Sequence, residues 1–573
     1  MAHSMSLSAR WGASMLAAAC AVTLVLPYAC IARPAPRAAP AAAPAVMPAA
    51  TAPKLIVAIA VDQFSADLFA EYRAHFTGGL ARLGQGAVFP SGYQSHAATE
   101  TCPGHATILT GVHPSRAGII ANTWIDQSVG RAKKAVYCAE DVSKIAADPK
   151  DYVASVTHLL VPTLGDRMKA LWPASRNVAV SGKDRGALMM GGHAIDQVYW
   201  WRGSGFATLE GRTLSPAAVK ENASVAGVLG AGSPGFALPE WCKARDRAIP
   251  LNASGTFSVG AGRLALKAGD KSSFRASPHL DRATVDLATE MVDELELGKG
   301  AVPDVLSVSL SATDYVGHGF GTEGAEMCIQ MQQLDLALGD FFMALDQRGI
   351  DYAVVLTADH GGFDMPERLD EQALPAAARA DKALMPDALS AVVAAKTGLE
   401  ARDLIQADGP SGDFWVRRDL SDADKARVIA TAKAELMAHP QVAAVFAAGE
   451  LAAAQMPSGS PETWGLMDRA KASFYQPRSG DMVVVLKRGV VPIPEAGPGY
   501  VATHGSVWDY DRRVPMLFWR KGMTGFEQPS PVQTIDIAPT LVALLGLPVV
   551  AGAFDGRCLD LDAGVGNTCG AAK

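Results

Sequence analysis

Four apolar runs in the sequence, each with polar residues close to it, most constrain what this chain can fold into. Uninterrupted apolar runs of this length are typical of strands buried on both faces of a parallel sheet. The runs are 55–61, ending at Asp62; 305–310, leading to Asp314; 353–356, leading to Asp359 and His360; and 514–519, shortly after His504.

Helical patterns lie between these runs, at 325–345, 422–438 and 534–545. Strands that alternate with helices indicate an α/β fold with an open, mostly parallel sheet. In such sheets the polar residues just past the strand ends line the ligand crevice. A single Asp after a strand is more often a helix cap or turn residue. Three of them, two with His nearby, favour a functional site.

The polar residues at these strand ends form a candidate metal-ligand set. Asp314 and His318 have a spacing that places both side chains on one face of a turn. Asp359 and His360 are adjacent, and two glycines after them permit a sharp turn. With Asp62 and His504 the set contains three carboxylates and three imidazoles, which suit zinc.

Thr101 is the candidate nucleophile. It precedes Pro103-Gly104 and an apolar stretch that predicts a helix. The hydroxyl therefore lies at a helix N-terminus, where backbone N–H groups and the helix dipole favour an anion. An ordinary capping Thr has the same pattern, and Thr99 is a second candidate. His96, His105 and His113 flank this segment, and the family resemblance described below gives them no ligand role.

Lys183 and Arg185 follow a strand-like segment at 177–181. Alternate residues of an extended segment point the same way, so both cations could contact one anion. An Arg fork and a Lys point charge are good partners for phosphate oxygens. An exposed basic pair would have the same sequence. Asn122, in Ile120-Ala-Asn-Thr-Trp124, is by itself compatible with a turn.

In this order, the motifs resemble the alkaline phosphatase superfamily. The chain is most similar to the type I phosphodiesterase/nucleotide pyrophosphatase family, and within it to bacterial alkaline phosphatases with a threonine nucleophile. The similarity extends from Leu55 to Leu547. The motifs that carry it are Asp62, Thr101-Cys-Pro-Gly-His105, Asp314-x3-His318, Asp359-His360 and His504.

The resemblance implies a mixed, mostly parallel sheet flanked by helices, with inserted cap segments over the active site. It also implies two Zn²⁺ ions and a phosphothreonine formed on Thr101, with Asn122 contacting a phosphate oxygen. One ion would be held by Asp314, His318 and His504. The other would be held by Asp62, Asp359, His360 and the Thr101 oxygen.

The expected function is an exported alkaline phosphatase of broad specificity for small-molecule phosphate monoesters. The resemblance makes the Lys183-x-Arg185 pair a mark of phosphomonoesterases, since two extra cations favour the more charged monoester. The alternative enzyme is a phosphodiesterase or nucleotide pyrophosphatase on the same scaffold. A phosphate- or metal-binding protein would need no nucleophile. A sulfatase is disfavoured because Cys102-Pro-Gly-His-Ala lacks the required Cys-x-Pro-x-Arg pattern.

The N-terminal region predicts export. No acidic residue occurs before Asp62, and Arg10 precedes an apolar run at 13–28. We expect a signal peptide at 1–31, an Ala/Pro-rich tether at 32–53 and a catalytic domain at 54–573, with an insertion around 364–480. The protein would then be periplasmic or secreted. It would contact a membrane only if the N-terminal segment were retained.

Charge and cysteine content restrict the partners further. With 51 basic and 58 acidic residues, the net charge is -7, which offers no broad cationic surface for nucleic acid. No obligatory protein partner is evident. Of the eight cysteines, Cys558 and Cys569 close a short loop and are the first candidates for a disulfide. No CxxC pair occurs, which disfavours a cysteine zinc site.

Overall fold

The structure is a computed structural model that describes residues 52–374 and 376–571. The predicted signal peptide at 1–31 and nearly all of the tether at 32–53 lie outside these residues. Across the two described ranges, no helix has both the length and the apolar character needed to cross a bilayer.

A ten-stranded mixed sheet forms the centre of the fold, in the order β19-β2-β18-β11-β1-β10-β5-β6-β7, with β20 paired to β2. Neighbours from β11 to β6 run parallel, whereas β18 is antiparallel to both β11 and β2. This confirms the predicted fold class. The strands are β1 (Leu55–Val61), β2 (Ala87–Tyr93), β5 (Asn177–Ser181), β6 (Gln197–Arg202), β7 (Gly205–Ala207), β10 (Asp304–Leu310), β11 (Tyr352–Thr357), β18 (Arg513–Arg520), β19 (Phe526–Glu527) and β20 (Val532–Gln533).

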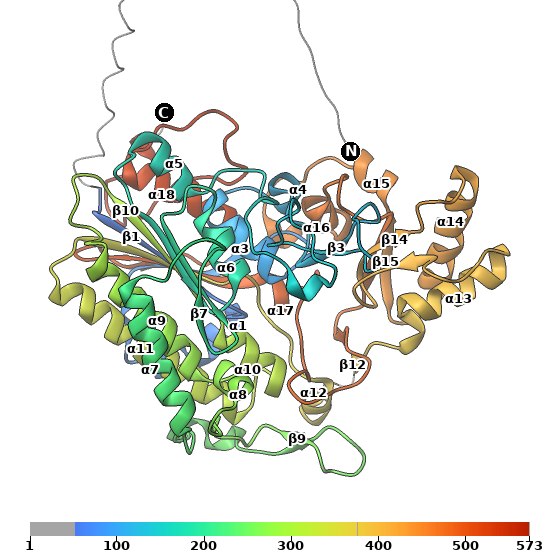
Figure 1. Cartoon of the computed structure of the whole chain (residues 1–573), viewed down its shortest axis with the longest axis horizontal. Coiled ribbons are helices and arrows are strands. Elements are labelled where there is room, and N and C mark those ends of the chain that lie inside the picture. Colours follow the sequence, from blue (N-terminus) through green and yellow to red (C-terminus); the bar gives the residue numbers. More distant parts are fainter. Residues whose placement is uncertain (1–51, 375, 572–573) are drawn as a thin grey trace, which may run out of the picture. The chain divides into compact units, whose positions relative to one another are not determined.

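Helices cover both faces of this sheet (Figure 1). Alternate residues of β1 pack into two different apolar clusters, Val57 and Ile59 into one, Ile56 and Ala58 into the other. This period of two explains why the strand is apolar throughout. The first face is covered by α1 (Ala66–Tyr72), α7 (Pro216–Ala231), α9 (Pro278–Glu294) and α11 (Ala325–Gln347), and the second by α3 (Thr101–Thr110), α5 (Leu164–Leu171), α6 (Asp184–Gly191) and α18 (Ile537–Leu545).

A second, four-stranded sheet has the order β13-β14-β16-β15. It packs on two helices through its own apolar cluster. The elements are β13 (Ile405–Gln406), β14 (Gly412–Val416), β15 (Val442–Ala447), β16 (Met482–Leu486), α13 (Pro386–Thr397) and α14 (Asp422–Ala438). The predicted insertion at 364–480 stays a prediction.

Short elements connect the two sheets and their helices. The helices are α2 (Gly79–Leu83), α4 (Pro114–Ala117), α8 (Lys271–Arg275), α10 (Ala312–Phe320), α12 (Pro366–Glu371), α15 (Ala448–Ala453), α16 (Leu466–Ser473) and α17 (Asp509–Arg512). The strands are β3 (Thr123–Ile125), β4 (Ala135–Tyr137), β8 (Ile249–Pro250), β9 (Ser258–Val259), β12 (Ala378–Arg379) and β17 (Val490–Val491). The 3₁₀ turns are η1 (Arg73–His75), η2 (Pro149–Asp151), η3 (Glu240–Arg245), η4 (Lys382–Leu384), η5 (Pro461–Thr463), η6 (Thr534–Asp536) and η7 (Thr568–Ala571).

Three disulfides cross-link the described residues. The predicted Cys558–Cys569 bridge is confirmed. The other two bridges, Cys102–Cys138 and Cys242–Cys328, were not assigned from the sequence. The four cysteines of these two bridges are all buried.

A glycine sets the distance between α3 and the end of β11. A Cβ atom on Gly104 would lie 2.0 Å from the carbonyl oxygen of Asp359. The helix can therefore approach the 359 backbone only because residue 104 has no side chain. This approach places Thr101, one turn earlier in α3, beside the residues that follow β11.

We expect Gly104→Ala to lower the free energy of unfolding by about 1–3 kcal/mol, because overpacking forces the helix away from β11. It should also lower kcat/KM. Gly227→Ala in α7 is the matched control: nothing lies within 4 Å of the added methyl, so it should stabilise by about 0.5–1 kcal/mol. Urea unfolding and steady-state kinetics measure both effects. Equal midpoints for the two variants would contradict the close-approach argument.

Candidate active site and metal centre

Four neighbouring parallel strands end at the same edge of the central sheet, and each is followed by a predicted site residue. In spatial order, β11 leads to Asp359 and His360, β1 to Asp62, β10 to Asp314 and β5 to Lys183. Because parallel strands share the direction of their carboxyl ends, residues that are far apart in sequence meet here.

The predicted carboxylates and imidazoles come together at this edge. His318 Nε2 and His504 Nε2 each lie 3.3 Å from Asp314 Oδ1. His360 Nε2 lies 3.2 Å from Asp359 Oδ2. Asp314 and His318 lie one turn apart on α10, so their predicted placement on one face is confirmed.

Among the described residues, two groups of ligand atoms are compact enough to hold an ion. One contains Asp314, His360 and His504, and the other contains Asp62, His105 and Asp359. We predict His360 with Asp62 and Asp359, and its Nε2 lies 3.2 Å from Asp359 Oδ2. Its ring also stacks on that of His504, with the ring centres 3.5 Å apart, so it borders both groups. The assignment of each ligand to one ion stays a prediction.

All three predicted ligand histidines use Nδ1 in the same way. Nδ1 donates to a backbone carbonyl oxygen, that of Ala502 for His318 at 2.9 Å, Gly361 for His360 at 2.8 Å and Thr99 for His504 at 2.8 Å. A carbonyl can only accept, so Nδ1 carries the proton and orients the ring. This is the arrangement typical of metal-ligating histidines.

His504 has the geometry of a ligand for a cation opposite Nε2. Its Nδ1 donates to a carbonyl oxygen, which leaves Nε2 facing an Asp314 oxygen across 3.3 Å. Burial, assisted by the neighbouring His360, lowers the pKa of His504 to about 4, which favours the neutral ring that binds metals.

The carboxylates of the second group are buried and face few positive groups. Asp62 Oδ2 and Asp359 Oδ2 are shielded from solvent, and their close neighbours are Lys183 Nζ, 2.9 Å from Asp62 Oδ2, and the nitrogens of His105 and His360, 3.3 and 3.2 Å from Asp359 Oδ2. Buried charges are costly unless they are paired or bind an ion. The site therefore fits divalent cations held by oxygen and nitrogen ligands.

Lys183 places a positive charge in direct contact with two of the site carboxylates. Its Nζ lies 2.6 Å from Asp314 Oδ2 and 2.9 Å from Asp62 Oδ2. Burial lowers the pKa of Lys183, but Asp314 and Asp62 outweigh it, so the pKa is raised overall. Lys183 therefore stays charged and connects the ends of β1 and β10.

The prediction of an extended segment at Lys183 and Arg185 was wrong. Lys183 is the N-cap of α6, and Arg185 lies in its first turn. A helical turn sends the two side chains to different partners: Lys183 to the carboxylates, and Arg185 Nη2 to Thr101 Oγ1 at 3.4 Å.

Thr101 is the first residue of α3 and is buried, as the sequence predicts. The competing hydroxyl, that of Thr99, donates to the Ser506 carbonyl oxygen at 2.7 Å. Thr99 therefore lies in a structural hydrogen bond, whereas Thr101 Oγ1 contacts the guanidinium of Arg185.

Asn122 lies beside the start of α3. Its Oδ1 accepts a hydrogen bond from the Cys102 backbone N–H at 2.8 Å. This bond determines the orientation of the amide, because only the oxygen can accept. The Nδ2 group then remains available as a donor near Thr101.

His105 is a residue that sequence reasoning discounted and that lies inside the site. Its Nε2 is 3.3 Å from Asp62 Oδ1, and its Nδ1 is 3.3 Å from Asp359 Oδ2. Burial lowers its pKa, but the two carboxylates outweigh this and raise it to about 10. Both nitrogens also contact protein oxygens, on Thr101 and Ser309, unlike those of the ligand histidines. Its position four residues after Thr101 was the available signal.

Gln63 was also missed. Its backbone N–H donates to Asp359 Oδ1 at 3.1 Å, and its Nε2 donates to Asp314 Oδ1 at 3.4 Å. Its φ of 63° is in the left-handed region, which is uncommon for a residue other than glycine. The motif pattern gave no signal for this residue beyond its adjacency to Asp62.

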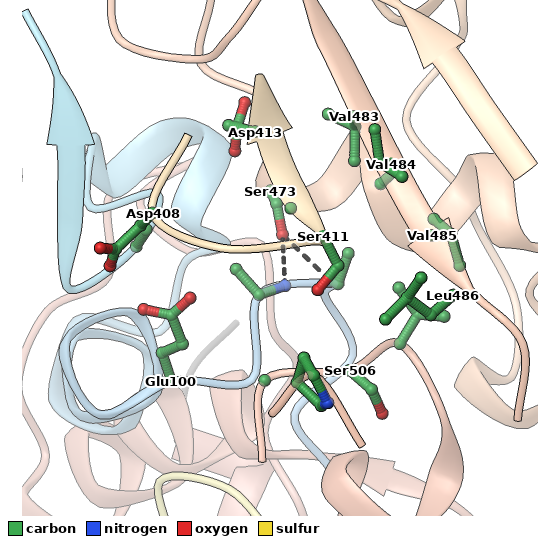
Figure 2. Close-up of a pocket in the computed structure, with 18 of the residues that line it drawn as sticks. Glu100, Asp408, Ser411, Asp413, Ser473, Val483, Val484, Val485, Leu486 and Ser506 are labelled. Carbon is green, nitrogen blue, oxygen red and sulfur yellow. Dashed lines mark hydrogen bonds between the residues drawn. The ribbon is translucent and has the colours of Figure 1, made fainter. Parts of the chain in front are cut away.

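Two cavities adjoin the site. One, about 80 Å³ in volume, is lined by apolar side chains and by Glu100, Asp408 and Asp413 (Figure 2). Burial raises the pKa of Glu100 to about 7 and that of Asp413 to about 6. Carboxylates at this position are unfavourable for a phosphate group.

The other cavity, about 450 Å³ in volume, is lined by Lys183, Asp184 and Arg185, and Asp184 accepts hydrogen bonds from Tyr137 and Tyr152. Three more cations lie around it, Arg202, Lys271 and Arg275, and none of the carboxylates in the described ranges forms an ion pair with them. Its walls carry Tyr137, Tyr152, Trp200, Trp201 and Tyr315. The cavity therefore favours an anionic ligand.

We expect removal of metal to destabilise the fold, because Asp62, Asp314 and Asp359 would face one another without their cations. Dialysis against a chelator should lower the melting temperature by about 5 °C or more, and added Zn²⁺ should restore it. His504→Ala should reduce this shift, whereas His193→Ala, at a partly exposed site elsewhere, should not. An unchanged melting temperature, with no metal released by elemental analysis, would contradict a metal centre here.

Comparisons with known proteins agree with this geometry. The model of the type I phosphodiesterase/nucleotide pyrophosphatase family matches residues 56–507. Alkaline phosphatase PhoK of Sphingomonas sp is 55% identical over 523 residues, covering 91% of this chain and 93% of PhoK. Alkaline phosphatase PhoD of Zymomonas mobilis is 51% identical over 519 residues, covering 90% and 89%.

The crystal structure of wild-type alkaline phosphatase PafA has a TM-score of 0.75 and 26% sequence identity, covering 89% of this chain and 98% of PafA. The family match includes every strand end described above, and the two relatives and this structure cover about nine-tenths of the chain. The chain belongs to the type I phosphodiesterase/nucleotide pyrophosphatase family.

Proposed function

We propose that this protein is an alkaline phosphatase that hydrolyses phosphate monoesters through a covalent phosphothreonine on Thr101. The observation that carries the proposal is the surroundings of the Thr101 hydroxyl. It lies at a helix N-terminus, 3.4 Å from the Arg185 guanidinium, and Lys183 joins two carboxylates of the same site. The relatives at 55% and 51% identity are both named alkaline phosphatases, which supports the same activity.

Thr101 Oγ would attack the phosphorus atom in line with the ester oxygen. The Oγ–P bond forms while the ester P–O bond breaks, and the alcohol leaves with its electron pair and takes up a proton. Water then attacks phosphothreonine, which releases inorganic phosphate and restores the hydroxyl. Arg185 and the Asn122 amide would hold nonbridging oxygens, and Lys183 would add positive charge beside them.

Two Zn²⁺ ions are part of the proposal. Asp314, His318 and His504 would hold one, and Asp62, Asp359, His360 and the Thr101 oxygen the other. Bound there, zinc supplies positive charge that favours ionised oxygens. Two ions bring +4 and the three carboxylates −3, so a phosphate dianion is attracted to the site.

The charges beside Thr101 favour monoesters over diesters. A monoester carries about −2 and three nonbridging oxygens, whereas a diester carries −1 and needs room for a second substituent. The cavity beside Arg185 is also lined by cations, so it too favours the more negatively charged monoester. A phosphodiesterase remains the alternative activity.

Export is proposed as well. The N-terminal sequence has the pattern of a signal peptide, and disulfides form in oxidising compartments. A periplasmic or secreted enzyme would act on small-molecule phosphate esters outside the cytoplasm.

Thr101→Ala should abolish the phosphoenzyme and lower kcat at least about a hundredfold, because no oxygen remains to attack phosphorus. Thr101→Ser keeps that oxygen and is the matched control. Rapid quench with labelled substrate detects the phosphoenzyme. A Thr101→Ala enzyme that retains more than about a hundredth of wild-type turnover would exclude this role.

Lys183→Ala combined with Arg185→Ala should reduce kcat/KM for p-nitrophenyl phosphate far more than for its bis-ester, since the lost charges act on the dianion. Parallel assays on both substrates give the ratio. An equal loss on the two esters would argue for the phosphodiesterase alternative. Lys243→Ala, on the exposed η3 turn, is the charge control, and it should change neither rate.

A further inference from the structure

Three polar groups of Asn122 form hydrogen bonds within the protein: its backbone N–H, its backbone carbonyl oxygen and its side-chain Oδ1. Its N–H donates to Glu100 Oε2 at 2.7 Å. Its Oδ1 accepts from the Cys102 N–H at 2.8 Å, and its carbonyl oxygen accepts from the Cys138 N–H at 2.9 Å. Only the Nδ2 group is left without a protein partner among the interactions of the described residues.

Two of these three partners are the halves of one disulfide, Cys102–Cys138. Cys102 follows Thr101 in α3, and Cys138 follows directly after β4. The bridge therefore joins the helix that carries the hydroxyl to the strand beside Asn122. Both cysteines are fully buried in an apolar cluster with Trp124 and Val136.

The same strand also reaches Arg185. Tyr137, next to Cys138, accepts a hydrogen bond from Arg185 Nη1 at 3.3 Å and donates to Asp184 Oδ1 at 2.7 Å. The β3–β4 hairpin thus contacts both groups proposed to hold phosphate oxygens. It is a small element, with three residue pairs between β3 and β4, so its own hydrogen bonds constrain it weakly.

A phosphate-binding amide must be held to within about half an ångström of its working position. Asn122 lies in a loop, outside both α3 and β3, so neither element determines its distance from Thr101. The disulfide and Glu100 provide that constraint. Glu100, labelled in Figure 2, is the N-cap residue of α3 and borders the cavity described above.

We propose that the Cys102–Cys138 disulfide and Glu100 are positioning residues, which hold the Asn122 amide at the distance from Thr101 that phosphate binding requires. They act through Asn122 and touch no reacting atom. The inference rests on the proposed function, because it needs Asn122 to contact phosphate. It makes full activity depend on oxidation of this one buried pair of thiols.

The first test compares two disulfide deletions, Cys102→Ser with Cys138→Ser, and Cys242→Ser with Cys328→Ser. The control bridge is equally buried and closes the longer segment, 86 residues against 36, so its loss should destabilise at least as much. Kinetics and inhibition by inorganic phosphate are measured well below both melting temperatures. We expect about a tenfold or larger rise in the phosphate inhibition constant for the first deletion alone.

The second test asks whether the effect passes through Asn122. Asn122→Ala is made in the wild-type chain and in the Cys102→Ser/Cys138→Ser chain. We expect Asn122→Ala to weaken phosphate inhibition by about tenfold in the first and to have little further effect in the second. Independent, multiplying losses would overturn the inference. If Asn122→Ala is silent in the wild-type chain, the proposed phosphate contact of Asn122 fails, and this inference fails with it.

A third comparison does not depend on the disulfide and stays informative if the deletion does not fold. Glu100→Ala removes the acceptor for the Asn122 N–H, whereas Glu100→Gln keeps a carbonyl oxygen at the same place. We expect Glu100→Ala to weaken phosphate inhibition and Glu100→Gln to restore most of it. Equal behaviour of the two variants, or a change in melting temperature without a change in phosphate inhibition, would overturn the positioning role.

Discussion

Three buried carboxylates, Asp62, Asp314 and Asp359, impose the electrostatic constraint on which the rest of the site depends. Ionised carboxylates this close repel one another strongly in a medium of low dielectric constant. Lys183 and His105 lie against these carboxylates and supply part of the opposing charge. Divalent cations bound among these carboxylates would neutralise their repulsion, and they would also attract an anionic substrate.

The fold brings these charged residues together from several segments, so no single segment forms the site. Four parallel strands end side by side, so each contributes only one or two residues. The proposed nucleophile, Thr101, lies on α3, and its approach to the site depends on Gly104 against the 359 backbone. Carbonyl groups orient the histidines: His504 and His318 bond to distant segments, at Thr99 and Ala502, and His360 bonds to the adjacent Gly361.

Sequence reasoning was most reliable where a local pattern has one structural solution. The apolar run 55–61 is a strand because alternate residues must face two helix layers, and Asp314 and His318 share a helix face because they are four residues apart. It was least reliable where the chain turns. Lys183 and Arg185 were read as an extended pair, but a helix begins between them. His105 was discounted because the family resemblance gives it no ligand role, and no local pattern reveals that α3 places its ring against Asp62 and Asp359.

The sequence by itself determined the fold class, five strands of the central sheet, the residues at their ends and the position of Thr101 at a helix N-terminus, because these follow from local periodicity and turn chemistry. Only the tertiary structure shows which ligand atoms lie close together, that His105 lies among them, and that Cys102 and Cys138 both donate hydrogen bonds to Asn122. Those features depend on distances between segments far apart in the chain, and packing sets such distances.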